Sequence, residues 1–206
     1  LMAVHVAVLL FGLSGLFGKL ISLPPLAIVF GRTTWASIAL ILYIRLRRQW
    51  QPLDTSDRGA LVISGALLAL HWFTFFESIR VSSVAVGLVT FSSFPLFVTF
   101  LEPLFFKSPL RRHDIMTVVL VMLGLLLVIP DYAFANRVTL GAFWGICSGA
   151  SFAVLALLNR RFSKRNSALC IAAVQNTVAA LVTLPFAWNA ASHLSATDLV
   201  GLLFLG

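Results

Sequence analysis

Long apolar runs separated by short polar breaks make up most of the chain. Prolines and charged residues divide eight such runs, at about 2–22, 26–46, 59–80, 81–106, 114–130, 138–159, 167–189 and from 198 onward. Each of the first seven is near the ~20 residues that a helix needs to cross the hydrocarbon core of a bilayer. The pattern therefore predicts an all-α polytopic membrane protein.

The eighth run is much shorter than the others. It reads "DLVGLLFLG" and stops at Gly206 after nine residues. A helix of that length rises less than half-way across the hydrocarbon. We therefore expect the chain to be incomplete, with about seven and a half of its membrane helices present.

Composition and charge placement agree with a membrane protein. Apolar residues make up 60% of the 206 residues and charged residues 11%, and the mean hydropathy is +0.99, whereas a soluble domain carries about a quarter charged residues. Fourteen of the fifteen basic residues flank the runs: eleven follow the second, fourth and sixth runs (Arg45, Arg47, Arg48, Arg58, Lys107, Arg111, Arg112, Arg160, Arg161, Lys164 and Arg165), and three lie in the other connections (Lys19, Arg80 and Arg137). This alternation predicts a cytoplasmic N-terminus and an inner (plasma) membrane location, in a bacterium. The net charge of +8 is thus explained by membrane topology, and we expect the lipid bilayer, not nucleic acid, as a partner.

The chain contains a weak internal repeat. The segment "FGLSGLFGK" (11–19) aligns with "FAVLALLNR" (152–160) at an offset of 141, "LAIVFGRTTWA" (26–36) with "LCIAAVQNTVA" (169–179) at 143, and "DRGALVISG" (57–65) with "DLVGLLFLG" (198–206) at 141. Chance similarity between leucine-rich helices is the alternative. A repeat of five spans is odd in number, so the second copy would be inverted in the membrane.

This repeat predicts two units, one over 1–130 and one over 138–206 that is incomplete at its C-terminus. The counterpart of 66–130 would fall at about 207–271 and bring the total to ten helices. Inverted repeats are typical of secondary transporters, which bind substrate near the bilayer midplane between the repeats.

Several segments resemble EamA-type members of the drug/metabolite transporter superfamily. They are Phe11-Gly12 with Lys19 eight residues after Phe11, "LPPLAIVFGR" (23–32) and "HWFTFFESIRVSSVAVGLVTFSSFPLFVTFLEPLF" (71–105), and "NRRFSK" (159–164) with "VQNTVAAL" (174–181) is similar to that family's second domain. The resemblance implies ten helices in two inverted halves and a central cavity lined by the first, third and fourth helices of each half. It also implies export or exchange of small metabolites, of which amino acids are the best-known class. Phenylalanine stands at Phe11 and Phe152, where the family often has tryptophan, and this leaves the subfamily open.

Polar groups near mid-depth are the candidates for substrate binding, because such groups are costly in hydrocarbon unless they are satisfied. His71 falls near the middle of the third run, and Pro95 should break the fourth helix beside two serines. The predicted substrate-binding residues are His71, Trp72, Phe75, Ser92, Ser93, Pro95, Ser14 and Ser148. For His71, the alternative is a hydrogen bond between helices that only orients packing.

A second group of residues is predicted to act in gating or as an ion pair. Arg32 and Glu77 lie near the same membrane surface, so they could pair, or each could extend separately to the interface. Trp144 is either an outer gate or a member of the interfacial aromatic belt. Gly141, Gly145 and Gly149 recur every four residues, which favours a close-packing helix face.

An enzyme is the main alternative to a carrier. The segment "GLSG" (12–15) matches the GxSG motif of intramembrane serine proteases, and Ser14 with His71 could form a catalytic dyad. A non-transporting membrane scaffold is the other alternative. The repeat favours a transporter, so we expect no catalytic residue, metal or cofactor, a zwitterionic small-molecule substrate and a monomer. Because no Asp or Glu lies at mid-depth in this sequence, coupling to an ion would use His71 or the part expected to be missing, and passive exchange is simpler.

Overall fold

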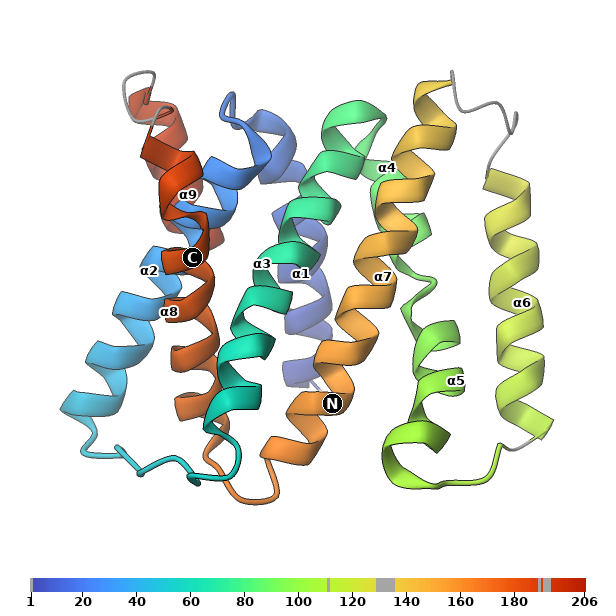
Figure 1. Cartoon of the computed structure of the whole chain (residues 1–206). Coiled ribbons are helices and arrows are strands. Elements are labelled where there is room, and N and C mark those ends of the chain that lie inside the picture. Colours follow the sequence, from blue (N-terminus) through green and yellow to red (C-terminus); the bar gives the residue numbers. More distant parts are fainter. Residues whose placement is uncertain (1, 111, 129–135, 189, 191–193) are drawn as a thin grey trace.

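The structure is a computed structural model that describes residues 2–110, 112–128, 136–188, 190 and 194–206. Helices form throughout these ranges, which contain no strand (Figure 1). The helices are α1 (Met2–Leu20), α2 (Pro25–Leu46), α3 (Arg58–Val81), α4 (Val84–Phe91), α5 (Phe94–Phe106), α6 (Arg112–Val128), α7 (Arg137–Phe162), α8 (Ala168–Ala187) and α9 (Ala196–Leu205).

The helices have the lengths and composition of a polytopic membrane protein. Among the described residues, five segments are long and apolar enough to cross a bilayer: α2, α3, α4 together with α5, α7 and α8. The helix α9 is apolar but shorter. This confirms the predicted all-α membrane class. The expected end of the fifth run at Pro130-Asp131 lies outside the described residues.

The fourth run, expected over 81–106 with a break at Pro95, forms two helices. Helix α4 ends at Phe91, Ser92 and Ser93 form a turn, and α5 begins at Phe94. Pro95 lies in the first turn of α5, where its missing N–H leaves no helical hydrogen bond unmade. The predicted break beside Pro95 is therefore confirmed, and it divides the span into two helices.

Glycines on α7 allow the backbone of its neighbours to approach closely. A Cβ atom at Gly145 would collide with Thr90 of α4, and one at Gly149 would lie 3.0 Å from the carbonyl oxygen of Phe91. A Cβ atom at Gly141 would collide with Ser82, next to the end of α3. The predicted close-packing face is confirmed, and it holds the broken span against α7.

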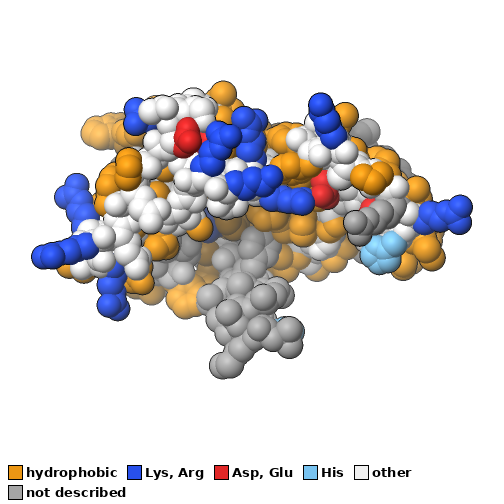
Figure 2. All heavy atoms as spheres, turned by 90° about the horizontal axis from the view of Figure 1, so that it is seen from below, with side chains coloured by type: hydrophobic (Ala, Val, Ile, Leu, Met, Phe, Trp, Pro, Cys, Tyr) orange, Lys and Arg blue, Asp and Glu red, His pale blue; other side chains and the backbone are white. Residues whose placement is uncertain are grey.

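The connections that carry most of the basic residues share one end of the bundle. The α2–α3, α5–α6 and α7–α8 connections all lie at the lower end in Figure 1. Figure 2 looks onto that end and shows many Lys and Arg side chains, both at its edge and across its middle. The helices thus place the basic connections together, as the charge count predicts for alternating spans.

Helices α3 and α9 begin with similar contacts to other parts of the chain. The carboxylate of Asp57, just before α3, accepts a hydrogen bond from Asn166 Nδ2 in the α7–α8 connection at 3.0 Å. The carboxylate of Asp198, in the first turn of α9, accepts one from the backbone N–H of Ser22 in the α1–α2 connection, also at 3.0 Å. Both aspartates are buried.

The two helices also meet equivalent neighbours further along. A Cβ atom at Gly65 of α3 would lie 2.5 Å from Val178 Cβ and 3.0 Å from the carbonyl oxygen of Gln175. One at Gly206, after α9, would lie 2.5 Å from Trp35 Cβ and 2.6 Å from the carbonyl oxygen of Arg32. Gly65 and Gly206 are separated by the first offset of the sequence repeat, 141, and their partners on α8 and α2 by the second, 143.

Candidate functional site

His71 lies between α3 and α7 and is completely buried. Its Nδ1 is 2.9 Å from Ser148 Oγ and 3.1 Å from the Ser148 carbonyl oxygen, and Ser148 Oγ donates a hydrogen bond to the His71 carbonyl oxygen at 3.1 Å. The hydrogen bond between helices is thus present. The other ring nitrogen, Nε2, is buried without a partner among the described residues, so the imidazole retains one unused polar atom.

Aromatic rings surround the imidazole. Four of them have centroids 4.8 to 6.4 Å from the His71 ring, and they belong to Trp72, Phe75, Phe91 and Phe152. The sequence identified the first two and missed Phe91 and Phe152 as neighbours. Proximity of Phe91 follows from the break after α4, and Phe152 lies one helical turn beyond Ser148 on α7. The ring is therefore enclosed by apolar walls in this structure.

The remaining predicted binding residues lie in different environments. Ser92 is exposed and donates to the Leu88 carbonyl oxygen at 2.9 Å, whereas Ser93 is buried and its hydroxyl has no partner in the described part of the chain. Pro95 and Ser14 are half-buried. The structure thus brings Ser148 to His71, exposes Ser92 and buries Ser93.

Arg32 does not form the ion pair that was considered with Glu77. Both Glu77 oxygens are held instead by Arg80, with Nε at 2.8 Å and Nη2 at 2.5 Å. Because these residues are three apart on α3, they lie on one face and pair bidentately without bridging two helices. The hypothesis of an Arg32–Glu77 pair is therefore wrong.

The Arg32 guanidinium packs on aromatic rings of α3. Its Cζ lies 3.3 Å from the centroid of the Trp72 ring and 5.9 Å from that of Phe76. Nε and Nη1 are buried and have no hydrogen-bond partner among the described residues. A cation–π contact of this kind stabilises a guanidinium by about 0.5–2 kcal/mol, but it leaves the donors unsatisfied.

Trp144 lies beside Phe73 rather than beside the His71 ring. Its ring meets Phe73 edge-on with the centroids 5.8 Å apart, and it also contacts Phe143 at 5.7 Å. The side chain is half-buried. Its role as an outer gate stays a prediction.

The proposed Ser14–His71 dyad does not form. Nδ1 of His71 is engaged by Ser148, and Nε2 has no hydrogen-bond partner in the described ranges. Ser148 itself donates to a backbone carbonyl and is fully buried, so it lacks the exposed position that a nucleophile needs. The geometry thus favours a structural or recognition role for the imidazole over catalysis.

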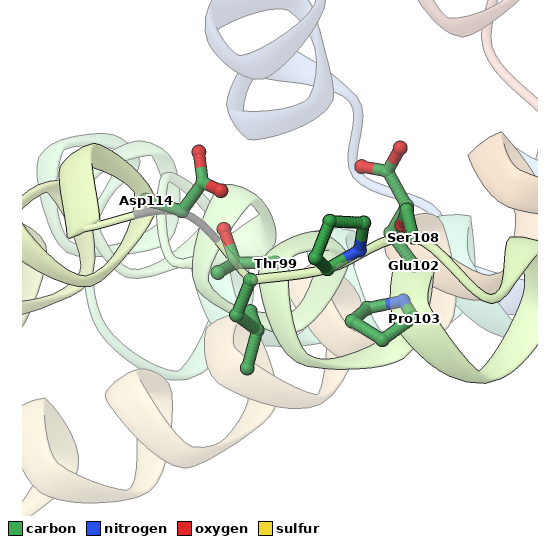
Figure 3. Close-up of a pocket in the computed structure, with 7 residues that line it drawn as sticks. Thr99, Glu102, Pro103, Ser108 and Asp114 are labelled. Carbon is green, nitrogen blue, oxygen red and sulfur yellow. The ribbon is translucent and has the colours of Figure 1, made fainter.

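A polar pocket of about 230 Å³ lies elsewhere, at the α5–α6 connection (Figure 3). Figure 3 shows Asp114 on one side of it and Glu102 on the other, with Thr99 between them. Glu102 accepts a hydrogen bond from Arg160 of α7 at 2.6 Å. Among the described residues, no three His, Cys, Asp or Glu side chains come together as metal ligands. This pocket is separate from the aromatic enclosure around His71.

Comparison with known families identifies the chain. The sequence model of the EamA-like transporter family matches residues 1–129, which is more than half of the chain. The chain belongs to the EamA-like transporter family. It is thus an integral membrane protein of a transporter family, and its matched part contains Arg32, His71 and the broken span. A search of curated proteins gave no match.

Proposed function

We propose that this EamA-family transporter exports or exchanges small metabolites, amino acids or related zwitterions, by alternating access between two inverted repeats. The paired contacts of α3 and α9 support the repeat most directly. Gly65 packs on α8 as Gly206 packs on α2, and Asp57 meets the α7–α8 connection as Asp198 meets the α1–α2 connection.

These pairs have the pattern that a pseudo-two-fold axis in the membrane plane produces. Each third helix begins against the connection between the first two helices of the other repeat. The two aspartates and the two glycines recur at the offset of 141 found in the sequence, and only the residues that they contact differ. A carrier with this symmetry can reach its second state when the halves exchange conformations around one binding site.

His71 is the proposed recognition group within the cavity between the repeats. Its free Nε2 can donate or accept a hydrogen bond, and Trp72 and Phe75 supply an apolar wall. Ser92, Ser93, Pro95 and Ser14 belong to the same proposed surface. Because Phe91 and Phe152 cover the imidazole, they must move for substrate to reach it.

The proposed orientation places the basic connections and the N-terminus in the cytoplasm of a bacterium. The shared end of the basic connections supports this orientation under the positive-inside rule. A protease-accessibility assay on inverted and right-side-out membrane vesicles would test it. Cleavage in the α7–α8 connection only from the periplasmic side would contradict the orientation.

The transport proposal is tested with full-length protein in proteoliposomes loaded with a panel of labelled amino acids. We expect efflux of at least one, and we expect His71→Ala to weaken binding while the yield of folded protein stays near normal. His113→Ala, at an exposed histidine of α6, is the matched control and should leave transport unchanged. Absence of flux across the panel would overturn the proposed function. Loss of folding in His71→Ala, with no separate loss of binding, would assign the imidazole to packing.

A further inference from the structure

Arg32 lies on a candidate membrane span, and its positive charge has no negative partner among the described residues. Two of its donors, Nε and Nη1, are buried and unpaired among the described residues, on a helix long and apolar enough to span the bilayer. A charge in such a place is costly unless it pairs or reaches water, and such residues commonly mark substrate paths. The contact with Trp72 positions the guanidinium but provides no hydrogen-bond acceptor.

The carboxylates that the structure describes are engaged elsewhere. Their partners are Arg80 for Glu77, Arg160 for Glu102, Asn166 for Asp57, Ser56 for Asp54, His113 for Asp114, and Ser195 with Ser22 for Asp198. No described acidic side chain therefore neutralises Arg32. The fork of guanidinium donors matches a carboxylate in shape and charge.

A second unpaired polar atom among the described residues, Nε2 of His71, belongs to a side chain that also contacts Trp72. The Arg32 Cζ atom lies 3.3 Å from the centroid of the Trp72 ring. The same Trp72 centroid is 4.8 Å from the centroid of the His71 ring. The buried Nε2 of His71 has no partner in the described ranges. Trp72 thus contacts two side chains from different helices, each of which has a buried polar atom without a partner among the described residues.

A small pocket lies next to this cluster. It measures about 110 Å³ between α1, α2 and α3, and its lining includes Phe76, Ile28, Lys19 and Arg80. Phe76 also lies 5.9 Å from the Arg32 guanidinium, so it is a neighbour of both the pocket and the charge. Lys19 in the lining gives the pocket a positive charge, whereas the charge of Arg80 is paired with Glu77.

We propose that Arg32 binds the carboxylate of the transported molecule, with Trp72 holding the guanidinium in place and His71 contacting a neighbouring polar group. This inference rests on the proposed transport function and deepens it, because it names an anionic group as the feature recognised. It also makes Arg32 a specificity-determining residue: a molecule with an amide in place of the carboxylate should be bound poorly.

The test compares acids with their amides on purified full-length protein. The probes are leucine with leucinamide, and 4-methylpentanoate with 4-methylpentanamide, and their apparent affinities are measured by protection against thermal unfolding. We expect each acid to bind wild type at least about tenfold more tightly than its amide. Equal binding of acids and amides, or no binding of either acid, would overturn the proposal.

Variants then assign the preference to Arg32. Arg32→Gln should bring the acid and amide affinities within about twofold of each other, and Arg32→Lys should give an intermediate ratio because its charge is retained without the planar fork. Arg137→Gln, at an exposed arginine at the start of α7, is the matched control and should keep the wild-type ratio. A full preference remaining in Arg32→Gln would overturn the proposal. If Arg32→Gln does not fold, a wild-type ratio of acid to amide affinity in Arg32→Lys would also overturn the proposal.

The same protein preparations are assayed for leucine efflux, which separates the two proposals. Efflux with no preference for acids would contradict the role of Arg32 and leave transport standing. Carboxylate binding that depends on Arg32, without efflux of leucine or of any amino acid of the panel described above, would support the site and contradict the proposed transport function.

Discussion

Arg32 on α2 and Gln175 on α8 occupy positions that the proposed repeat makes equivalent, but their surroundings differ. Gln175 is buried, and its Nε2 donates to Ser64 Oγ at 2.8 Å and to Asn159 Oδ1 at 2.6 Å. Arg32 packs on Trp72 and leaves two buried donors without a partner in the described part of the chain. The protein thus supplies hydrogen-bond acceptors for the amide of Gln175, whereas two buried donors of Arg32 have none among the described residues.

This difference shows how two similarly packed helices can take different roles. Both positions carry a polar residue next to a glycine contact, from Gly65 to α8 and from Gly206 to α2. Buried polar groups in folded proteins are normally hydrogen-bonded, and the amide of Gln175 follows that rule as a structural link between α8, α3 and α7. The guanidinium of Arg32 is an exception to this rule, because two of its buried donors have no partner among the described residues. This is what we expect of a group that binds a ligand.

The glycine contact beside Gln175 gives the largest expected effect on stability. Gly65→Ala would place a Cβ atom 2.5 Å from Val178 Cβ and 3.0 Å from a backbone oxygen, so α3 and α8 must separate. Overpacking of this kind costs about 1–3 kcal/mol. Thermal unfolding of the purified protein in detergent, followed by intrinsic fluorescence, should show a clear decrease in melting temperature.

The matched control is Gly59→Ala on the same helix. Gly59 has no heavy atom within 4 Å of the position a Cβ atom would take. The added methyl group should be neutral or stabilise by up to ~1 kcal/mol, because alanine favours helix more than glycine does. Equal destabilisation by both substitutions would show that the Gly65 contact with α8 is not tight.

The two equivalent positions should respond in opposite directions when made apolar. Gln175→Leu removes hydrogen bonds to Ser64 and Asn159 and should destabilise by about 1–2 kcal/mol. Arg32→Met removes a buried charge that has no ion-pair partner among the described residues, and it should be neutral or stabilising. The lost cation–π contact with Trp72 is offset because the cost of burying the charge is also removed. The same unfolding assay measures both, and strong destabilisation by Arg32→Met would indicate that the guanidinium has a structural partner.

The membrane fold was largely predictable from sequence because it depends on periodic, local signals. Apolar run length placed the helices to within a few residues, Pro95 marked the break between α4 and α5, and the spacing of Gly141, Gly145 and Gly149 indicated the packing face of α7. Each of these features needs only a rule about backbone hydrogen bonding or side-chain size.

The partners of the polar residues were less predictable. Depth in the membrane suggested that Arg32 could reach Glu77, but Arg80 is three residues from Glu77 on the same helix and takes both carboxylate oxygens. The partner of His71 on α7 depends on the rotation of two helices about their axes, which sequence period alone does not give. The i,i+3 spacing of Glu77 and Arg80 was a signal that could have corrected the pairing.

The aspartates before α3 and within the first turn of α9 give the smallest contrast between the proposed repeats. Asp198 accepts hydrogen bonds from Ser22 N, Ser195 N and Ser195 Oγ, whereas Asp57 accepts one from Asn166 Nδ2. Asp198→Asn should therefore destabilise by about 1 kcal/mol, because it weakens a capping box and a charge-assisted contact, and Asp57→Asn by about 0.5 kcal/mol. Thermal unfolding of the two variants side by side measures the difference. A larger loss of stability for Asp57→Asn than for Asp198→Asn would contradict this expectation. It would mean that the contact between Asp57 and Asn166 contributes more stability than its single hydrogen bond indicates.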